Sequence, residues 1–253
     1  MDDPTLVTGG TGTLGRAVVR RLMQDERPVR VLSRRPRPVG SRAACEWAVG
    51  DLRTGQGIDD AVRGAGPIVH CATTRTGKDV TATRTLVEAA GRAGSPHLVY
   101  ISIVGTERVP MFYYRAKHEC ERVVAESGLP WTILRATQFH DLLAGLTTAQ
   151  RLLPVALAPG GGMCFQPVDV REVAERLVEL ASGAPAGRVP DLAGPEVREG
   201  TDLARAVLSA HGRRRPVVPV VLPGKASRAL RDGALTVPER AVGRITFEEY
   251  LAR

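Results

Sequence analysis

A short apolar run, Thr5-Leu-Val-Thr8, lies near the start of the chain and is followed by a segment with a different periodicity. In residues 14–25 the apolar positions recur every three or four residues, at Leu14, Ala17, Val18 and Leu22. An apolar run bounded by glycine predicts a buried strand, and the three-to-four spacing predicts an amphipathic helix. The chain therefore opens with a strand, a glycine turn and a helix.

The same alternation of apolar strands and helical stretches continues to about residue 135. The further strands that the pattern predicts cover 29–32, 45–49, 66–72, 97–102 and 131–135, and the helices cover 57–63, 80–93 and 115–127. Strands that alternate with helices pair in parallel. We therefore predict an α/β fold, a Rossmann-like doubly wound parallel sheet.

Residues 136–253 follow a looser pattern that proline and glycine interrupt throughout. The pattern predicts a turn at 160–162, a strand at 164–168, and helices at 170–181 and 201–210. We expect residues 1–135 to form one domain and residues 136–253 to form a small C-terminal lobe that is interleaved with it.

Charge and aromatic content bear on the class of partner. The formal net charge is +8, but all except three of the 35 basic residues are arginines, an excess that fits a compositional bias of the whole chain better than one binding face. The densest basic runs, at 34–37 and 213–215, are short. Four Phe, four Tyr and two Trp leave few rings that can stack on bases. A nucleic-acid partner is therefore not expected.

Targeting segments and metal sites are not expected either. No apolar run approaches the roughly 18 residues that span a bilayer, and the chain opens with Met1-Asp2-Asp3-Pro4 rather than with a basic segment before an apolar stretch. We expect a cytoplasmic protein with no membrane partner. The four cysteines form no CxxC pair and the five histidines show no ligand spacing, which argues against a disulfide framework and a metal site.

The glycine turn has the spacing of a dinucleotide-binding loop. In this interpretation Gly9 permits the tight turn, Gly12 lets the backbone approach a diphosphate at the helix N-terminus, and Gly15 lets the helix pack on the strand. Glycine is common in this chain, with 27 residues, so a plain glycine-rich turn is the alternative. The residues that we expect to hold the diphosphate are Gly9, Thr11, Gly12, Thr13, Leu14 and Gly15.

The end of the second predicted strand favours NADP(H) over NAD(H). An acidic residue about 20 positions after the glycines accepts hydrogen bonds from the ribose in NAD sites, whereas an arginine there accommodates the 2′-phosphate. Ser33, Arg34 and Arg35 occupy this place, with no acidic residue beside them. A guanidinium grips a phosphate through two parallel hydrogen bonds, so Arg34 is the expected ligand, and Ser33 adds another hydrogen bond.

Two further strand ends are candidates for the cofactor. Asp51 and Leu52 follow the third strand, where a carboxylate can meet the adenine amino group while leucine covers the ring; a helix-capping Asp51 is the alternative. Cys71, Ala72 and Thr73 end the fourth strand, where small side chains let a ribose lie against the backbone. We expect His70 to pack within the strand.

Tyr113 and Lys117 lie four residues apart in the stretch that follows the fifth strand, which Ser102 ends. On a helix this spacing places both side chains on one face. Hydride reduction of a carbonyl needs an acid at the developing alkoxide, and a neighbouring ammonium lowers the pKa of a phenol from about 10. We therefore expect Tyr113, Lys117 and Ser102 to be catalytic, with aromatic packing as the alternative for Tyr113.

The chain resembles the short-chain dehydrogenase/reductase superfamily and, more narrowly, its atypical NmrA-like branch. The segments that carry the resemblance are Val7–Gly15, Gly50–Leu52, Tyr100–Gly105, Tyr113–Lys117 with Glu121, Ser127–Arg135, Val168–Ala174 and Gly243–Leu251. The resemblance implies an NADP-binding Rossmann domain over 1–135, a small substrate-binding lobe over 136–253, and Lys117 on the nicotinamide ribose. It also implies that Thr137, Gln138 and Phe139 lie by the nicotinamide, with Phe139 and Met163 as walls of an apolar pocket; core packing is the alternative for each.

The activity that the resemblance implies is an NADPH-dependent reduction of a quinone or carbonyl, with a small aromatic or carbonyl substrate. Family members that tailor aromatic polyketides reduce quinones that then react with oxygen, so support of an oxygenation is an extension of this reading. Many NmrA-like proteins keep the lysine and lack the tyrosine, which leaves the role of Tyr113 open. A non-catalytic NADP-sensing regulator and a nucleotide-sugar epimerase or dehydratase are the alternatives. The sequence does not indicate the oligomeric state.

Overall fold

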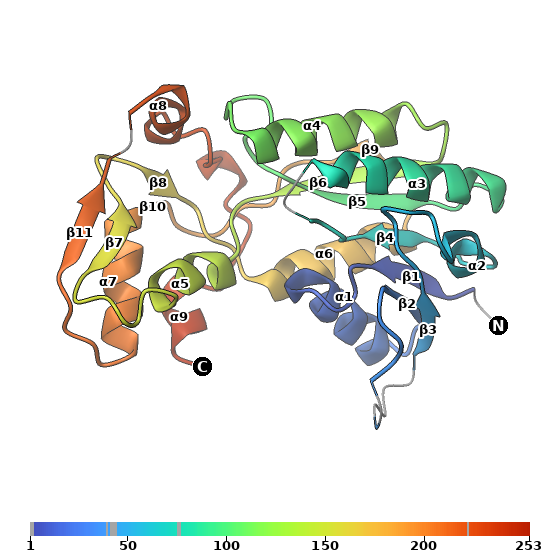
Figure 1. The fold of residues 1–253 in the computed structure, drawn as a ribbon, viewed down its shortest axis with the longest axis horizontal. Helices are drawn as coiled ribbons and strands as arrows, with labels where there is room; N and C mark the ends of the chain where they lie inside the picture. Colours follow the sequence, from blue (N-terminus) through green and yellow to red (C-terminus); the bar gives the residue numbers. More distant parts are fainter. Residues whose placement is uncertain (1–2, 39, 41–44, 75–76, 222) are drawn as a thin grey trace. The chain divides into compact units, whose positions relative to one another are not determined.

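The computed structural model describes residues 3–38, 40, 45–74, 77–221 and 223–253 (Figure 1). The chain divides into two compact units. Unit 1 comprises Met1–Ser102, Arg115–Leu134 and Val173–Val189, and unit 2 comprises Ile103–Tyr114, Arg135–Glu172 and Pro190–Arg253. The chain passes between the units near the expected boundary at residue 135, but it also passes between them at four other points.

Unit 1 is built on a seven-stranded sheet in the order β3-β2-β1-β4-β5-β6-β9. Its strands are β1 (Thr5–Thr8), β2 (Val29–Ser33), β3 (Glu46–Val49), β4 (Ile68–His70), β5 (Leu98–Ile103), β6 (Trp131–Ala136) and β9 (Gly187–Arg188). Val7 pairs in parallel with Val31 on one side and with Val69 on the other. The predicted doubly wound parallel sheet is confirmed.

Helices cover both faces of this sheet. They are α1 (Thr13–Gln24), α2 (Ile58–Val62), α3 (Lys78–Arg92), α4 (Phe112–Ala125) and α6 (Val170–Ser182), of which α4 and α6 begin in unit 2. Figure 1 shows α3 and α4 along one face and α1 and α6 along the other. Strand order runs in opposite directions from β1, so right-handed crossovers place α1 and α3 on opposite faces.

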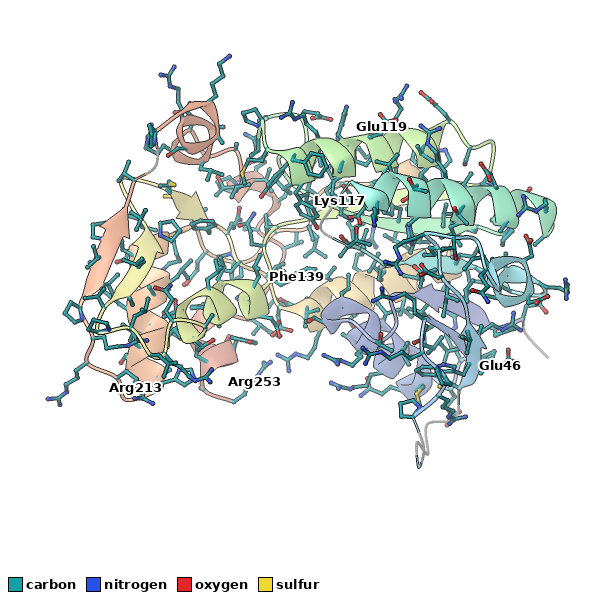
Figure 2. The ribbon with its side chains drawn as sticks, in the orientation of Figure 1. Glu46, Lys117, Glu119, Phe139, Arg213 and Arg253 are labelled. Atoms are coloured by element: carbon teal, nitrogen blue, oxygen red, sulfur yellow. The ribbon has the colours of Figure 1, made fainter. Side chains whose placement is uncertain are left out.

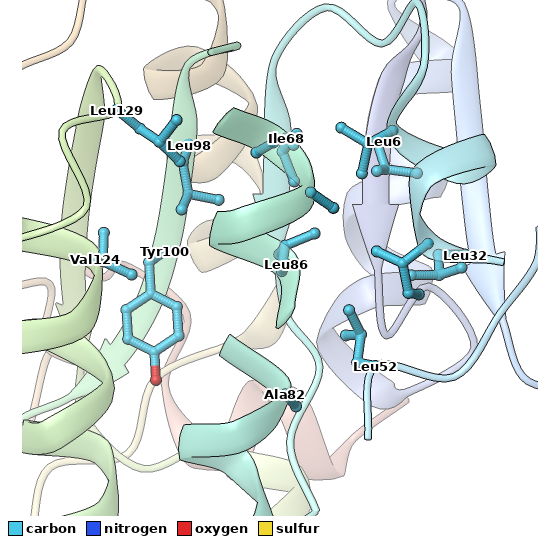
Figure 3. Close-up of a cluster of buried hydrophobic side chains, with 14 of the residues drawn as sticks. Leu6, Leu32, Leu52, Ile68, Ala82, Leu86, Leu98, Tyr100, Val124 and Leu129 are labelled. Atoms are coloured by element: carbon cyan, nitrogen blue, oxygen red, sulfur yellow. The ribbon is translucent and has the colours of Figure 1, made fainter. Parts of the chain in front are cut away.

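One hydrophobic core of unit 1 lies between the sheet and helices α2, α3 and α4. It contains Leu6, Ile68, Leu86, Leu98 and Tyr100, each no more than 1% exposed (Figure 3). Tyr100 is the largest of these side chains and carries a hydroxyl into an otherwise apolar cluster, so that hydroxyl needs a partner.

Unit 2 has two small sheets and its own core. Its elements are α5 (His140–Thr148), β7 (Ala156–Pro159), β8 (Cys164–Phe165), β10 (Arg198–Glu199), α7 (Gly200–Ala210), β11 (Val217–Val220), α8 (Lys225–Arg231), a 3-10 turn (Pro238–Arg240) and α9 (Phe247–Leu251). Strands β8 and β10 pair antiparallel, and β7 and β11 pair in parallel. Leu143, Met163, Leu203, Val207 and Phe247 belong to the buried cluster.

No helix within the described ranges is both long and apolar enough to cross a bilayer. The expectation about targeting segments also used the first two residues, Met1 and Asp2, and these lie outside the described residues.

Candidate functional site

The predicted residues of unit 1 follow the carboxyl ends of neighbouring strands. Gly9 comes directly after β1, Arg34 after β2, Asp51 two residues after β3 and Cys71 after β4, while Ser102 lies one residue before the end of β5. These strands are neighbours in the sheet, in the order β3-β2-β1-β4-β5, and each pair of neighbours is parallel. Strands β2 and β3 lie on one side of β1, whereas β4 and the later strands lie on the other side. Ligands of open α/β sheets bind in the crevice at such a switch point, which here lies between β1 and β4.

The glycine turn after β1 is shaped by close backbone contacts. Gly9 has a φ of +66°, and a Cβ on it would lie 2.7 Å from the backbone nitrogen of Ala72, which follows β4. A Cβ on Gly15 would overlap the carbonyl oxygen of Gly9. Both glycines are therefore required by the packing of the turn itself.

Gly12 differs, because the protein leaves space around it. A Cβ on Gly12 would meet one atom, the carbonyl oxygen of Gly9, at 3.2 Å. Gly12 is also the N-cap of α1, whose first turn has no capping side chain and no acidic residue, and Thr11, Gly12 and Thr13 are exposed. An uncapped helix N-terminus offers free amide groups and a positive dipole end to an anion. The turn thus fits the diphosphate of a dinucleotide.

His70 ties the ends of β1 and β4 together inside unit 1. Thr83 Oγ1 donates to the carbonyl of Asp79 over 2.9 Å, so it accepts from Nε2–H of His70 at 3.2 Å. Nδ1 of His70 is then the acceptor for Thr8 Oγ1 at 2.6 Å, and Thr8 Oγ1 in turn accepts from the backbone N–H of Ala72 at 3.3 Å. Burial, with a smaller effect of Lys117, lowers the pKa of His70 to about 3, so the ring is neutral.

The segment after β4 is held by Asp79, a residue that the sequence analysis missed. Asp79 is 4% exposed, and its carboxylate accepts from Thr73 Oγ1 over 2.6 Å and from the backbone N–H of Thr74. Its place in the first turn of α3 is a local signal that was available. Burial raises the pKa of the half-buried Cys71 thiol to about 12, so the thiol is neutral.

Arg34 and Arg35 leave the sheet as exposed side chains. The Oγ of the buried Ser33 accepts from the backbone N–H of Arg35 over 3.1 Å, and the carbonyl of Arg35 accepts from the indole N–H of Trp47 over 2.9 Å. Within the described part of the chain, the Arg34 guanidinium has no ion pair. An unpaired guanidinium at the end of β2 fits the 2′-phosphate of NADP.

Asp51 is already engaged by a neighbour. Its carboxylate accepts from the backbone N–H of Arg53 at 2.9 Å and from the Arg53 guanidinium, which together lower its pKa to about 2, with a smaller contribution from Arg34. Asp51 closes a turn rather than a helix, since α2 begins at Ile58. Leu52 is 8% exposed and belongs to the core of unit 1.

Lys117 is anchored at the carboxyl end of β5. It comes from α4 (Figure 2), is 4% exposed, and its ammonium donates to Tyr100 Oη and to the carbonyl of Ile101, each over 3.1 Å. The next residue, Ser102, is 1% exposed, and its Oγ has no hydrogen-bond partner in the part of the chain that the structure describes. A buried hydroxyl that no protein group satisfies is suited to bind a ligand oxygen.

Tyr113 lies in the first turn of α4, so it and Lys117 share one helix at the predicted spacing. Tyr113 is half-buried and meets Tyr114 edge-on, with ring centroids 6.0 Å apart. Burial raises the pKa of Tyr114 to about 12. Tyr114 packs against the apolar cluster of unit 2, which assigns the packing function to Tyr114 and leaves the acid role of Tyr113 as a prediction.

The residues expected beside the nicotinamide belong to unit 2 and contact its backbone. Thr137 Oγ1 accepts from the N–H of Gly194 at 3.3 Å, and the Gln138 amide donates to the carbonyl of Leu235 at 3.2 Å. Phe139 is the half-buried N-cap of α5 (Figure 2). Met163 is buried in the core of unit 2. The cofactor roles of Thr137, Gln138 and Phe139 remain predictions.

Known proteins are similar to this chain in sequence and in fold. An NAD(P)H-binding family model matches residues 9–182. A (4-alkanoyl-5-oxo-2,5-dihydrofuran-3-yl)methyl phosphate reductase of Streptomyces griseus is 33% identical over 76% of this chain and 68% of the relative. An NAD(P)H azoreductase of Xenophilus azovorans is 29% identical over 86% of this chain and 77% of the relative. The fold matches that of an NADPH-dependent quinone oxidoreductase of Escherichia coli complexed with NADPH, with a TM-score of 0.83 at 19% identity and 98% coverage of both chains.

Proposed function

Because the chain belongs to the NAD(P)H-binding family, we propose that it is an oxidoreductase that uses NADPH to reduce a small quinone or carbonyl compound. The observation that carries this proposal is the uncapped N-terminus of α1 beside the open flank of Gly12, at the switch between β1 and β4. Reductases among the relatives support the reaction class. The narrower assignment to the NmrA-like branch is part of the proposal.

Different residues of unit 1 bind different parts of the cofactor in this proposal. The amides that begin α1, with Thr11 and Thr13, hold the diphosphate, and the guanidinium of Arg34 binds the 2′-phosphate with help from Ser33 and Arg35. Asp51 and Leu52 lie at the strand end proposed for the adenine, and Cys71, Ala72 and Thr73 at the one proposed for the ribose. Bound NADPH supplies the hydride and its two electrons.

Lys117 and Ser102 are the groups that we assign to the reacting end. The Lys117 ammonium has three N–H donors, of which Tyr100 and Ile101 take two, so one is left for a ribose hydroxyl. The hydroxyl of Ser102 donates to the substrate oxygen that gains negative charge. Tyr113 supplies a proton to an alkoxide product, and this proton is needed for a carbonyl substrate more than for a quinone.

The substrate class is proposed from what the named relatives share. A furanone phosphate reductase, an azoreductase and a quinone oxidoreductase act on conjugated acceptors, by their names. We therefore favour a conjugated quinone or enone for this chain, which includes an aromatic polyketide quinone whose reduced form reacts with oxygen. Thr137, Gln138 and Phe139 of unit 2 are the residues proposed for the nicotinamide end.

Steady-state oxidation of NADPH by the purified protein tests this function. The acceptor panel contains simple quinones, conjugated enones, isolated carbonyls and an azo dye, with a nucleotide sugar as the control substrate. We expect turnover with quinones or enones and none with the nucleotide sugar. Tight NADPH binding without turnover on any acceptor would favour the sensor, and conversion of the nucleotide sugar would favour the epimerase.

A further inference from the structure

We propose that Tyr100 is a positioning residue for Lys117, a role that rests on the function proposed above. Tyr100 lies on β5 and is 1% exposed within the core of unit 1 (Figure 3). Its Oη lies 3.1 Å from the Lys117 ammonium, and the ammonium lies 4.8 Å from the centre of the Tyr100 ring. The phenol that holds the lysine thus comes from the sheet.

The donors and acceptors of the two side chains fix which of them donates in the contact between Lys117 and Tyr100. An ammonium has no lone pair, so Tyr100 Oη accepts from Lys117 and its own hydrogen is left for another acceptor. Burial raises the pKa of the thiol of Cys120, one turn along α4 from Lys117, and smaller effects of Thr83, Lys117 and Tyr100 oppose this shift. Toward Lys117 the Tyr100 phenol therefore acts only as an acceptor.

The hydroxyl matters because Lys117 is buried. Removing a charged ammonium from water is costly unless acceptors surround it, and the structure provides two, Oη of Tyr100 and the carbonyl of Ile101. The neighbouring His70, whose ring centre is 5.4 Å from that of Tyr100, is neutral and adds no repulsion. Without the Tyr100 hydroxyl the ammonium would keep one anchor and gain freedom to turn away from the ribose.

A plain packing role makes a different prediction. Phenylalanine fills the volume of the tyrosine ring and keeps its contact with His70, so a Tyr100→Phe variant removes the hydroxyl alone. If Tyr100 acts through Lys117, the loss appears in NADPH binding and disappears when Lys117 is absent. If Tyr100 only packs, the loss appears in stability and is independent of Lys117.

The test is a double-mutant cycle of Tyr100→Phe and Lys117→Met, read as the dissociation constant for NADPH. We expect Tyr100→Phe to raise this constant, and the KM for NADPH, by about tenfold with a smaller fall in kcat, and to change nothing further in the Lys117→Met background. The control is Tyr114→Phe, which removes a half-buried phenol from α4, the helix that carries Lys117. We expect this variant to leave NADPH binding unchanged. An equal effect of Tyr100→Phe in both backgrounds, or none in either, overturns the proposal.

Because the cycle is read by binding, it distinguishes failure of this inference from failure of the proposed reaction. A chain that binds NADPH and reduces nothing still yields the coupling between Tyr100 and Lys117. If the Tyr100→Phe variant does not fold, fluorine NMR of protein with fluorotyrosine at its four tyrosines replaces it. The Tyr100 resonance is then expected to move on Lys117→Met more than those of Tyr114 and Tyr250, and an unmoved Tyr100 resonance overturns the proposal.

Discussion

Thr8 Oγ1 donates a hydrogen bond of 2.6 Å to Nδ1 of His70, and this contact joins the last residue of β1 to the last residue of β4. The glycine turn begins one residue after Thr8, and Ala72, which the turn contacts, lies two residues after His70. The neutral imidazole therefore holds together the two strand ends between which the dinucleotide is proposed to bind.

The neutrality of His70 predicts acid sensitivity of the fold. The pKa of His70 is about 3 in the folded chain and about 6.5 when unfolded, so the unfolded chain takes up the proton first and stability falls as pH decreases through this window. The slope is up to about 1.4 kcal/mol per pH unit for this group. Urea denaturation of the wild type and of His70→Asn at several pH values measures it.

His97 and His140, whose pKa values burial also lowers, are present in both proteins and cancel in the comparison. We expect His70→Asn to be less stable than the wild type at neutral pH and the gap to narrow by about 2 kcal/mol between pH 6.5 and 4.5. A gap that stays constant over this range would show that His70 titrates normally in the folded state.

Two alanine substitutions separate the structural and ligand-binding roles of the glycine turn. Gly15→Ala places a Cβ on the carbonyl of Gly9, so we expect a loss of several kcal/mol in the free energy of unfolding. Gly12→Ala places its Cβ against one backbone oxygen at 3.2 Å, so we expect it to cost less than about 1 kcal/mol while it weakens NADPH binding by about tenfold or more. Thermal denaturation and a fluorescence titration with NADPH are the measurements. Equal loss of stability in the two variants would contradict this division.

Arg34 is expected to set the preference for NADPH. Arg34→Ala should raise the KM for NADPH by about ten- to one-hundredfold, the range for loss of charge-assisted hydrogen bonds, and should change the KM for NADH little. Arg20→Ala, which removes an exposed guanidinium from α1, is the matched control for net charge. If the two variants lower NADPH affinity alike, the effect comes from overall charge and Arg34 is not the phosphate ligand.

Tyr113→Phe distinguishes two kinds of substrate. With a carbonyl substrate, loss of the acid should lower kcat by about one-hundredfold or more, whereas a quinone substrate should show less than about a threefold change. Lys117→Ala is expected to lower turnover with both. The measurement is kcat for each acceptor across a pH series, and a large loss of quinone turnover in Tyr113→Phe would contradict the quinone assignment.

Local patterns predicted the sheet well because its strands and helices are marked by short-range periodicity. The six strands from β1 to β6 and the helices between them lie within a few residues of their predicted places. Helix α4 begins at Phe112, three residues earlier than predicted, because Tyr114 packs its first turn against the apolar cluster of unit 2. Aromatic residues at a helix start give a weak local signal, so this turn was missed.

Unit 2 was harder to predict because apolarity and burial do not coincide there. In α5, Leu142 and Leu146 are exposed while His140 and Thr147 are buried, so the helix has no readable apolar face. The pairing of β7 with β11 joins residues some sixty positions apart, as in Leu157 with Val218. The division into discontinuous units likewise depends on contacts that no local pattern carries.

The candidate site shows the same contrast between local and distant contacts. The glycine turn, Arg34 and the spacing of Tyr113 and Lys117 are sequence-local, and the family match confirms the predicted nicotinamide cofactor. The anchoring of Lys117 by Tyr100 needs the position of α4 over β5, and the His70 network joins three separate elements. Such contacts become visible only once the sheet order is known.

An anaerobic single-turnover experiment measures directly whether the protein transfers a hydride from NADPH to a quinone. The protein is mixed with NADPH and a limiting amount of one quinone or enone of the panel at a time, and the loss of NADPH and of the acceptor is followed together. We expect one NADPH to be consumed for each quinone reduced, because a hydride carries two electrons, with no need for oxygen. NADPH that stays bound and unoxidised beside every quinone and enone of the panel would contradict this expectation.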